Sequence, residues 1–123
     1  MCRPRRARRN KLMEIVEQKQ GGVLIVGLKG RLDATNSTTT QDRIVSLIDA
    51  GSHQVVIDLS GLDYISSAGL RIFLMAGKKL KASNGKIALF GLQPAIHEIF
   101  EIAGFVGLFP ICSSREEAVA TVQ

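Results

Sequence analysis

Three short, almost continuously apolar segments, each followed by a longer helix-like segment, constrain the fold of this 123-residue chain. The apolar segments are residues 23–28, 55–59 and 86–90, and they are rich in Val, Ile and Leu. Such runs are typical of strands that are covered on both faces of a parallel sheet. Apolar residues recur at helical spacing after each run, at 38–50, 68–81 and 94–103. This alternation predicts helices packed on a mostly parallel sheet.

Weaker patterns at the two ends of the chain add a hairpin, an edge strand and a last helix. Residues 14–19 are joined to the first apolar run by Gly21-Gly22, which is typical of a hairpin turn. Residues 108–112 form a short strand that Pro110 confines to an edge, and Ser114-x-x-Glu117 is a capping box for a helix over 115–122. The sequence therefore predicts one α/β domain over residues 13–123, with a mixed, mostly parallel sheet of about five strands, about four helices and an opening β-hairpin.

The same patterns predict where individual elements begin and end. The second strand ends before a loop over 30–33, and the third ends at Leu59, before a loop that contains Asp63. Asn36, Ser37 and Thr38 can each cap the first helix, and Thr38-x-x-Gln41 has the spacing of a capping box. Ser67 is the predicted cap of the second helix. The predicted inward stripes are Leu70, Phe73, Leu74, Gly77 and Leu80 on the second helix, and Ile96, Ile99, Phe100 and Ala103 on the third.

Positive charge is concentrated in residues 1–12, which hold six of the sixteen basic residues and none of the eleven acidic ones. The rest of the chain has ten basic and eleven acidic residues, a net charge of −1. We expect residues 1–12 to be a disordered basic N-terminal arm. Such an arm can contact nucleic acid or an anionic membrane surface. The arginines are not interleaved with aromatic residues, which favours an extension upstream of a functional start at Met13, or a cloning remnant, and direct nucleic-acid binding is not expected.

The remaining composition argues against secretion, membrane insertion and catalysis. No apolar run is long enough to span a bilayer or to form a secretory signal, and two cysteines, Cys2 and Cys112, do not make a disulfide framework. We therefore expect a cytoplasmic protein. His53 and His97 stand near no nucleophile motif, and neither a Gly-rich phosphate loop nor a metal-ligand spacing is present. We expect no catalytic residue, no metal and no cofactor.

Acidic and hydroxyl residues follow the ends of the predicted strands. Asp33, Asp58, Asp63, Ser66 and Ser67 fall after two neighbouring strands, whose carboxyl ends meet at one edge of a parallel sheet. One interpretation is structural: the aspartates fix the loop and a serine caps the helix. The other is a phosphorylation switch, because a phosphate at the start of a helix meets unpaired N–H groups and adds about −1.5 to −2 charges at pH 7.

Residues 55–71, VVIDLSGLDYISSAGLR, resemble the signature of STAS domains, specifically of the bacterial anti-sigma factor antagonists. Residues 30–34, GRLDA, resemble the other recurrent segment of that family. The resemblance extends over residues 13–122 in the order of elements. It implies that Ser67 is the phosphorylated residue, with Ser66, which stands where the family often has Asp, as the second choice. It also implies a partner-binding rim of Asp33, Asp58, Asp63, Ser66, Ser67, Ala68, Gly69 and Arg71.

The resemblance implies partner switching rather than catalysis by this chain. The unphosphorylated antagonist binds an anti-sigma factor that is a serine kinase, and a sigma factor is freed. The kinase then uses ATP and magnesium to phosphorylate the serine, and a metal-dependent phosphatase restores it. The sequence leaves self-association of this chain open. The alternative is a STAS regulatory subunit of a lipid or anion ABC transport system, which uses the same rim without phosphorylation.

Overall fold

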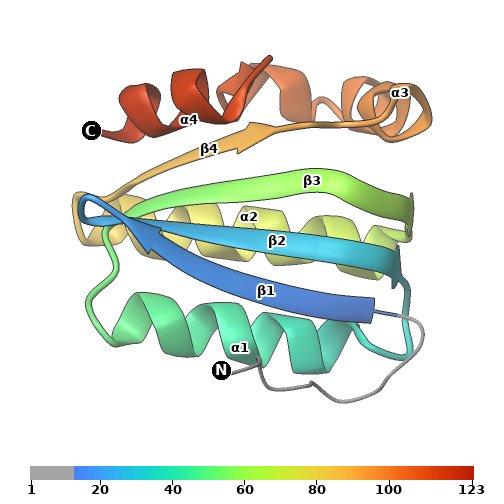
Figure 1. Cartoon of the computed structure of the whole chain (residues 1–123). Helices are drawn as coiled ribbons and strands as arrows, with labels where there is room; N and C mark the ends of the chain where they lie inside the picture. The colour runs from blue at the N-terminus through green and yellow to red at the C-terminus, as the bar shows by residue number, and fades with distance from the viewer. Residues whose placement is uncertain (1–12) are drawn as a thin grey trace, which may run out of the picture.

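The computed structural model describes residues 13–123, which form one five-stranded sheet and four α-helices packed on it (Figure 1). The strands lie in the order β1-β2-β3-β4-β5; β1 pairs with β2 antiparallel, and every other pairing is parallel. The predicted fold class is therefore confirmed. The predicted basic arm lies outside the described residues. The strands are β1 (Met13–Gln20), β2 (Val23–Leu32), β3 (Gln54–Ile65), β4 (Lys86–Phe90) and β5 (Ile111–Cys112).

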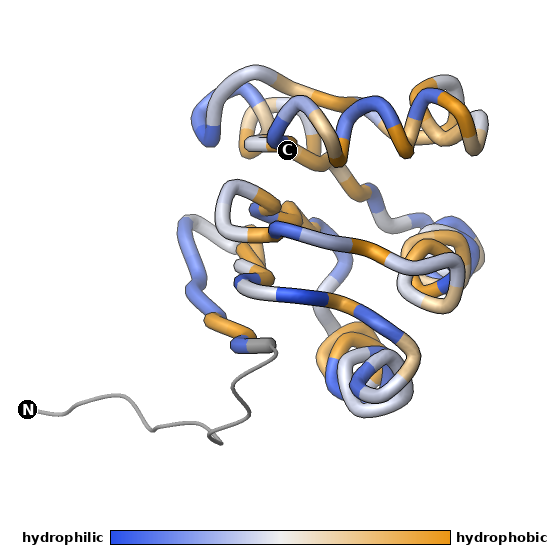
Figure 2. Tube along the Cα trace, turned by 90° about the vertical axis from the view of Figure 1, so that its right-hand side faces the viewer, coloured by the Kyte–Doolittle hydropathy of each residue, from blue (hydrophilic) through white to orange (hydrophobic). Residues whose placement is uncertain are grey.

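Helices cover both faces of the sheet, but not equally (Figures 1 and 2). One face carries α1 (Ser37–Asp49) and α2 (Ser67–Ala82), and its large core also takes in α3 (Pro94–Ile102) and the 3-10 turn η1 (Phe105–Gly107). The other face carries α4 (Arg115–Val122). The residues buried under α4 come from the starts of β2 and β3, from β4 and from β5: Val23, Ile25, Val56, Ala88 and Cys112.

Two strands extend further than the apolar runs predicted. β2 continues through Leu32, and β3 continues to Ile65, so the predicted loops over 30–33 and around Asp63 are wrong. The register between the two strands shifts at two places, between Gly27 and Lys29 and between Gly30 and Arg31. Each bulge changes the alternation of inward and outward side chains, which hides the continuation in the sequence.

The helix boundaries and stripes also differ in detail from the prediction. Of the three candidate caps of α1, Asn36 stands at the N-cap position, so the capping box predicted at Thr38 is not formed. The first residue of α2 is Ser67, and its N-cap is Ser66. β5 has two residues instead of five. On α2 the buried residues are Gly69, Ile72, Phe73, Ala76 and Leu80, whereas Leu74 is 38% exposed, and on α3 they are Ile96 and Phe100, whereas Ala103 is exposed.

The predicted capping box of α4 is half correct. Ser114 is the N-cap, and its hydroxyl accepts a hydrogen bond from the backbone N–H of Glu117 at 3.1 Å. The Glu117 carboxylate, however, accepts from the N–H and the hydroxyl of Ser113, not from Ser114. These two bonds hold the pKa of Glu117 below its ordinary value.

Candidate functional site

The junction between β3 and α2 is built around Ser66. Its backbone N–H donates to the carbonyl of Leu32 at 2.9 Å, which attaches the start of α2 to the end of β2. Its hydroxyl accepts from the N–H of Gly69 at 3.2 Å, and its carbonyl accepts from the N–H of Leu70 at 2.9 Å. This is the geometry of an N-cap, which satisfies donors that a helix start leaves unpaired. The sequence prediction that Ser67 is the cap is therefore wrong.

Ser67 follows as the first residue of α2, and its side chain is exposed. Its hydroxyl makes no hydrogen bond with any residue of the described part of the chain. The first turn of α2 contains no acidic residue, so the partial positive charge of the helix start is not neutralised there. The position combines an accessible nucleophilic oxygen with a field that favours a negative group.

Gly69 holds the helix start against the two long strands. A Cβ on Gly69 would lie 2.8 Å from Cγ of Leu32 and 2.9 Å from Cγ1 of Ile65. Leu32 and Ile65 are paired across β2 and β3 and are both buried. Gly69 is buried as well, so it shapes the predicted rim through packing and presents no side chain on it. Ala68, beside it, is half-buried.

The loop between β2 and α1 lies next to Ser66 and is organised by Asn36. Asn36 is 4% exposed; its amide oxygen accepts from the N–H of Asp33 at 3.0 Å and its amide nitrogen donates to the carbonyl of Arg31 at 2.8 Å. Its own carbonyl accepts from the hydroxyl of Thr40 at 2.9 Å. From the sequence, Asn36 is expected only as a candidate cap of the first helix and not as the residue that organises this loop. A side-chain amide placed soon after a strand end was its only signal.

Asp33 is the acidic residue nearest to Ser66 along the paired strands. Its carboxylate accepts from the hydroxyl of Thr35 at 2.6 Å and from the N–H of Thr35 at 3.0 Å. The hydroxyl bond, together with the backbone bond and the charge of Arg31, holds the pKa of Asp33 below its ordinary value of 3.8. Asp33 is therefore ionised throughout the physiological range.

Outward-facing residues of β2 and β3 border the junction. The Arg31 guanidinium lies 4.3 Å from the centre of the Tyr64 ring, and the two residues are register partners. Tyr64 is 38% exposed, and neither member of this cation–π pair was identified from the sequence, because the bulges set their register.

Asp63 accepts from the side-chain amide of Gln93 at 3.4 Å. Arg71, four residues after Ser67, lies on the same side of α2.

Asp58 does not join the other rim residues. It lies eight residues before Ser66 on β3, roughly 25 Å along an extended strand. Its carboxylate accepts from the N–H of Ser60 at 2.9 Å and from the hydroxyl of Ser60 at 2.7 Å, and it is paired with Phe90 at the end of β4. The structure thus brings together Asp33, Ser66, Ser67, Ala68 and Arg71, which we call the serine rim, with Asp63 and Gly69 beside and beneath it.

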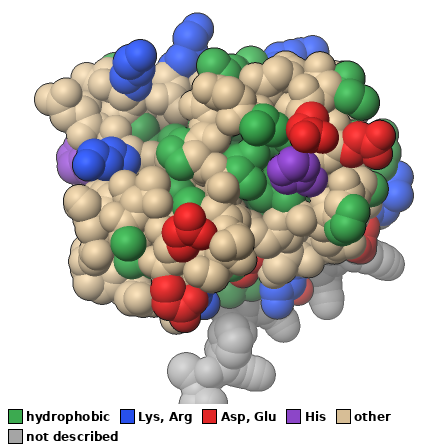
Figure 3. Space-filling view, turned by 90° about the horizontal axis from the view of Figure 1, so that it is seen from above, with side chains coloured by type: hydrophobic (Ala, Val, Ile, Leu, Met, Phe, Trp, Pro, Cys, Tyr) green, Lys and Arg blue, Asp and Glu red, His purple; other side chains and the backbone are tan. Residues whose placement is uncertain are grey.

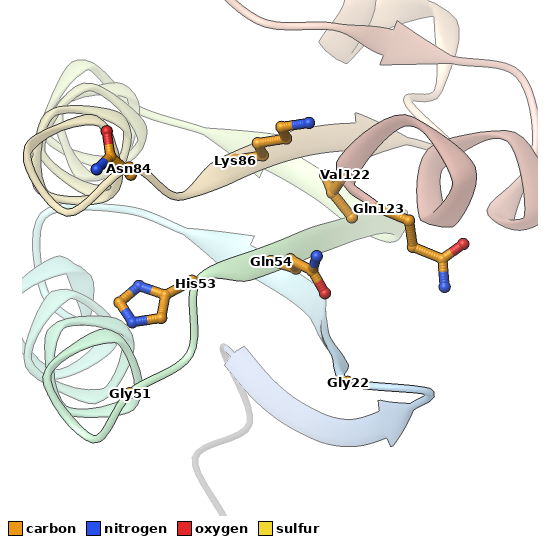
Figure 4. A pocket seen from close by; sticks show the side chains of 8 residues that line it. All are labelled: Gly22, Gly51, His53, Gln54, Asn84, Lys86, Val122 and Gln123. Carbon is orange, nitrogen blue, oxygen red and sulfur yellow. The ribbon is translucent and has the colours of Figure 1, made fainter.

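Two hollows lie away from the serine rim. One, of ≈ 320 Å³, is lined by Gly91, Leu92, His97, Ile111, Cys112 and Ser113, on the side shown in Figure 3, where hydrophobic side chains gather beside a histidine. The other, of ≈ 350 Å³, is at the opposite end of the strands (Figure 4). It contains Lys86 and His53, and the C-terminal ends of α1, α2 and α4 surround it. Helix C-termini disfavour an anion, and the lysine disfavours a cation.

Residues 13–123 contain no group of three or more His, Cys, Asp and Glu side chains placed to hold a metal ion. In that range, no helix has the length and apolar character needed to cross a membrane.

Comparison with known proteins gives consistent matches over almost the whole described region. BtrV of Bordetella bronchiseptica, provisionally named an anti-sigma factor antagonist, is 41% identical over 108 residues, which is 88% of this chain and 93% of BtrV. The crystal structure of an anti-sigma factor antagonist from Mycobacterium paratuberculosis superposes with a TM-score of 0.82 at 23% identity, covering 89% of this chain and 93% of the other.

SpoIIAA, a Bacillus cell fate determinant and anti-sigma factor antagonist, has been solved in unphosphorylated and phosphorylated forms. The two forms match with TM-scores of 0.77 and 0.70 at 20% identity, covering 89% of this chain and 96% and 100% of SpoIIAA. The family profile described as the STAS domain matches residues 14–118. The protein therefore belongs to the STAS domain family, and the named relatives that it resembles are anti-sigma factor antagonists.

Proposed function

We propose that this protein is an anti-sigma factor antagonist whose binding is switched by phosphorylation of Ser67. Unphosphorylated, it binds an anti-sigma factor with serine-kinase activity through the serine rim, and a sigma factor is freed. Phosphorylated, it is released. The site works in the cytoplasm and the chain itself catalyses nothing. The observation that carries this proposal is the exposed hydroxyl of Ser67 at the start of α2, which bonds to no residue of 13–123.

Ser67 is favoured over Ser66 as the phosphorylated residue because the two hydroxyls are in different states. The Ser66 hydroxyl caps α2 through Gly69, and its side chain is half-buried. A phosphate on Ser66 would have to displace this cap. The kinase would transfer the γ-phosphoryl group of ATP to the Ser67 oxygen, with the hydroxyl proton passing to a kinase base and ADP leaving. A metal-dependent phosphatase would return the serine by adding water across the phosphate ester and releasing inorganic phosphate.

Charge explains why a phosphate would end the complex. An interface that fits a neutral hydroxyl desolvates that position, and a doubly charged group without a partner there is strongly unfavourable. We expect Ser67→Asp to lower the affinity for the captured anti-sigma factor by about 2 kcal/mol or more, roughly thirtyfold. In Ser67→Asn the side chain has nearly the shape of Asp but no charge, and we expect this variant to bind within about threefold of the parent.

The experiment has two stages and uses the full chain. Lysate of the host is first incubated with ATP and magnesium, and the phosphorylated residue is located by mass spectrometry in the parent, in Ser67→Ala and in Ser66→Asn. Asn keeps the cap of α2 but cannot accept a phosphate. Phosphate on Ser67 in the parent and in Ser66→Asn, and none in Ser67→Ala, supports the proposal. Phosphate that persists in Ser67→Ala and disappears in Ser66→Asn would reassign the switch to Ser66.

The second stage uses Ser67→Asn and Ser67→Asp as baits in a pull-down from the same lysate. A kinase-like ATPase retained by the Asn bait and lost from the Asp bait supports partner switching, and calorimetry on the purified pair gives the affinity ratio. A transporter ATPase retained equally by both baits would overturn the proposal and favour the alternative, a STAS regulatory subunit of a lipid or anion ABC transport system.

A further inference from the structure

Four exposed apolar side chains lie over the aromatic part of the larger core. Phe100 of α3 lies edge-to-face against Phe73 of α2 and Phe105 of η1, and the ring centre of Phe105 is 5.8 Å from that of Phe109. Each of these four rings has an exposed apolar residue within two positions of it in the chain: Leu74, Ile102, Val106 and Leu108. We call these four residues the apolar patch. Because the rings form one continuous series of contacts, the four residues lie in one region of the surface.

The segment that follows η1 lies directly against α2, which brings the members of the patch together. A Cβ on Gly77 would lie 2.9 Å from Cε1 of Phe109. Leu74 is the neighbour of Gly77 in the preceding turn of α2, and Leu108 precedes Phe109. The patch holds four of the six large hydrophobic residues that are exposed in the described part of the chain. An exposed apolar patch of this kind marks an interaction surface.

The two helices that border the patch carry charges of opposite sign. α2 contains one arginine and three lysines but no acidic residue, and α3 contains two glutamates but no lysine or arginine. Residues 105–112 are uncharged. Lys78 lies one turn after Leu74 on α2, and Glu98 lies one turn before Ile102 on α3. Both are exposed, and neither forms a salt bridge with any of residues 13–123.

This distribution of charge is complementary to itself after a rotation by 180°. In a pair with two-fold symmetry, the same surface of both copies meets, and every contact occurs twice. The basic border of each copy then faces the acidic border of the other, and the two apolar patches meet between them. An apolar centre with a polar rim is the usual composition of a protein interface. A partner with charge of one sign would be attracted by one border and repelled by the other.

We propose that the apolar patch is the interface of a two-fold homodimer, in which Lys78 of each copy faces Glu98 of the other. The dimer covers Ile102 and Leu108, which are 80% and 61% exposed in the single chain. This inference goes beyond the proposed function, because it concerns the association of the chain with itself and requires neither a phosphate nor an anti-sigma factor.

Sedimentation equilibrium of the full chain, between about 1 and 500 µM, measures the dissociation constant of the dimer. We expect a value on the order of 10 µM, as for a weak and transient interface. Ile102→Gln and Leu108→Gln, tested separately, should each weaken the dimer by about tenfold or more. Val16→Gln is the control, because Val16 is exposed on β1, at the other edge of the sheet from β5, and it should change the constant by less than about twofold.

A charge exchange tests the two-fold arrangement itself. Lys78→Glu places like charges opposite each other twice in the pair, and so does Glu98→Lys, so each variant alone should dimerise about tenfold more weakly or worse. In an equimolar mixture, one contact joins the two altered side chains and the other joins the two native ones, and both are attractive. The mixed pair should therefore form within about threefold of the parent constant.

The matched control mixes Lys19→Glu with Glu14→Lys, two exposed positions on β1. These variants change the net charge by the same amounts, and each alone and their mixture should stay within about twofold of the parent. Circular dichroism and the melting temperature check that every variant is folded. Recovery in the mixture cannot come from misfolded chains.

A parent chain that stays monomeric over the whole range would overturn the inference and leave the patch to a different protein. A dimer that tolerates Lys78→Glu and Glu98→Lys, or a mixture no tighter than its components, would also overturn it, because the dimer would then use another surface. These measurements contain no kinase and no phosphate, so their failure leaves the proposed function standing. Failure of the lysate experiments equally leaves the homodimer standing.

Discussion

At the scale of single residues, Asn36 gives the loop beside the serine rim its shape. Its buried amide is the partner of two backbone groups, the N–H of Asp33 and the carbonyl of Arg31. Asn36→Ala would leave both groups without that partner, so we expect the free energy of unfolding to fall by about 1–3 kcal/mol. Thr38→Ala is the matched control, since Thr38 is exposed and does not cap α1, and we expect a change within about 0.5 kcal/mol. Urea denaturation of the two variants measures both values; equal losses would contradict the assignment.

Asp33 supplies a prediction on pH at the same scale. The hydroxyl of Thr35 holds the pKa of Asp33 below 3.8, so the folded state favours the ionised carboxylate. This contribution is complete above the ordinary pKa and disappears as the pH falls through the lowered value in the folded protein. Thr35→Val removes the hydroxyl donor, and we expect the Asp33 pKa to rise toward 3.8 and the loss of stability below about pH 4 to become shallower.

A carboxyl-carbon NMR titration measures the Asp33 pKa directly in the parent and in Thr35→Val. Thr39→Val is the control, because Thr39 is exposed on α1 and makes no hydrogen bond to Asp33. We expect it to leave the Asp33 titration unchanged. A Thr35→Val protein that titrates like the parent would show that the backbone bond and the charge of Arg31, not the hydroxyl, lower the pKa.

At the scale of elements, the sequence predicted which strands and helices exist but not where several of them end. The apolar runs that begin at Val23 and Val55 contain enough Val, Ile and Leu to be recognised as buried strands. Both strands continue, to Leu32 and Ile65, through bulges. A bulge interrupts the alternation of inward and outward side chains by which a strand is recognised in a sequence.

The candidate site was predictable to a similar extent. The carboxyl ends of adjacent parallel strands bring Asp33 close to Ser66 and Ser67, as the general rule for such sheets requires. The prediction for Asp58 is wrong because the apolar run ends beside it, at Leu59, whereas β3 itself continues to Ile65. Two consecutive serines are equally suited to an N-cap, so only the observed bond from the Gly69 N–H to Ser66 decides between them.

The packing of α2 on the two long strands gives a prediction at this scale. Gly69→Ala would gain about 1 kcal/mol of helix propensity, but its methyl group would overlap the buried side chains of Leu32 and Ile65. Overpacking of this kind usually costs about 1–3 kcal/mol, so we expect a net loss of stability and a lower melting temperature. Gly107→Ala is the control, because nothing lies within 4 Å of its added methyl group, and we expect no loss. A Gly69→Ala protein more stable than the parent would show that α2 can shift away from the sheet.

At the scale of the whole molecule, the two faces of the sheet differ in the strength of their cores. One face buries a continuous cluster that includes side chains of α1, α2, α3 and η1. In it the ring of Phe100 makes edge-to-face contacts with Phe73 and Phe105, with ring centres 5.5 and 5.6 Å apart. The other is covered by α4, a helix of eight residues over the first half of the strands. The serine rim lies at the opposite end of β2 and β3 from this smaller cluster. Loss of packing in the cluster beneath α4 should therefore leave the structure of the serine rim unchanged.

Hydrogen exchange can test this separation of the two faces. Val122, the last residue of α4, is fully buried in the smaller cluster, and Val122→Ala should lower the free energy of unfolding by about 2 kcal/mol. Because α4 is short and contacts only the smaller cluster, we expect its amides and those of β5 to exchange faster while the first turn of α2 keeps its protection. Phe100→Ala, in the larger cluster, should lower stability by about 3–5 kcal/mol and accelerate exchange throughout the described domain, including the first turn of α2. If Val122→Ala deprotected the first turn of α2 as much as α4, the two faces would form one cooperative unit and the rim would depend on both.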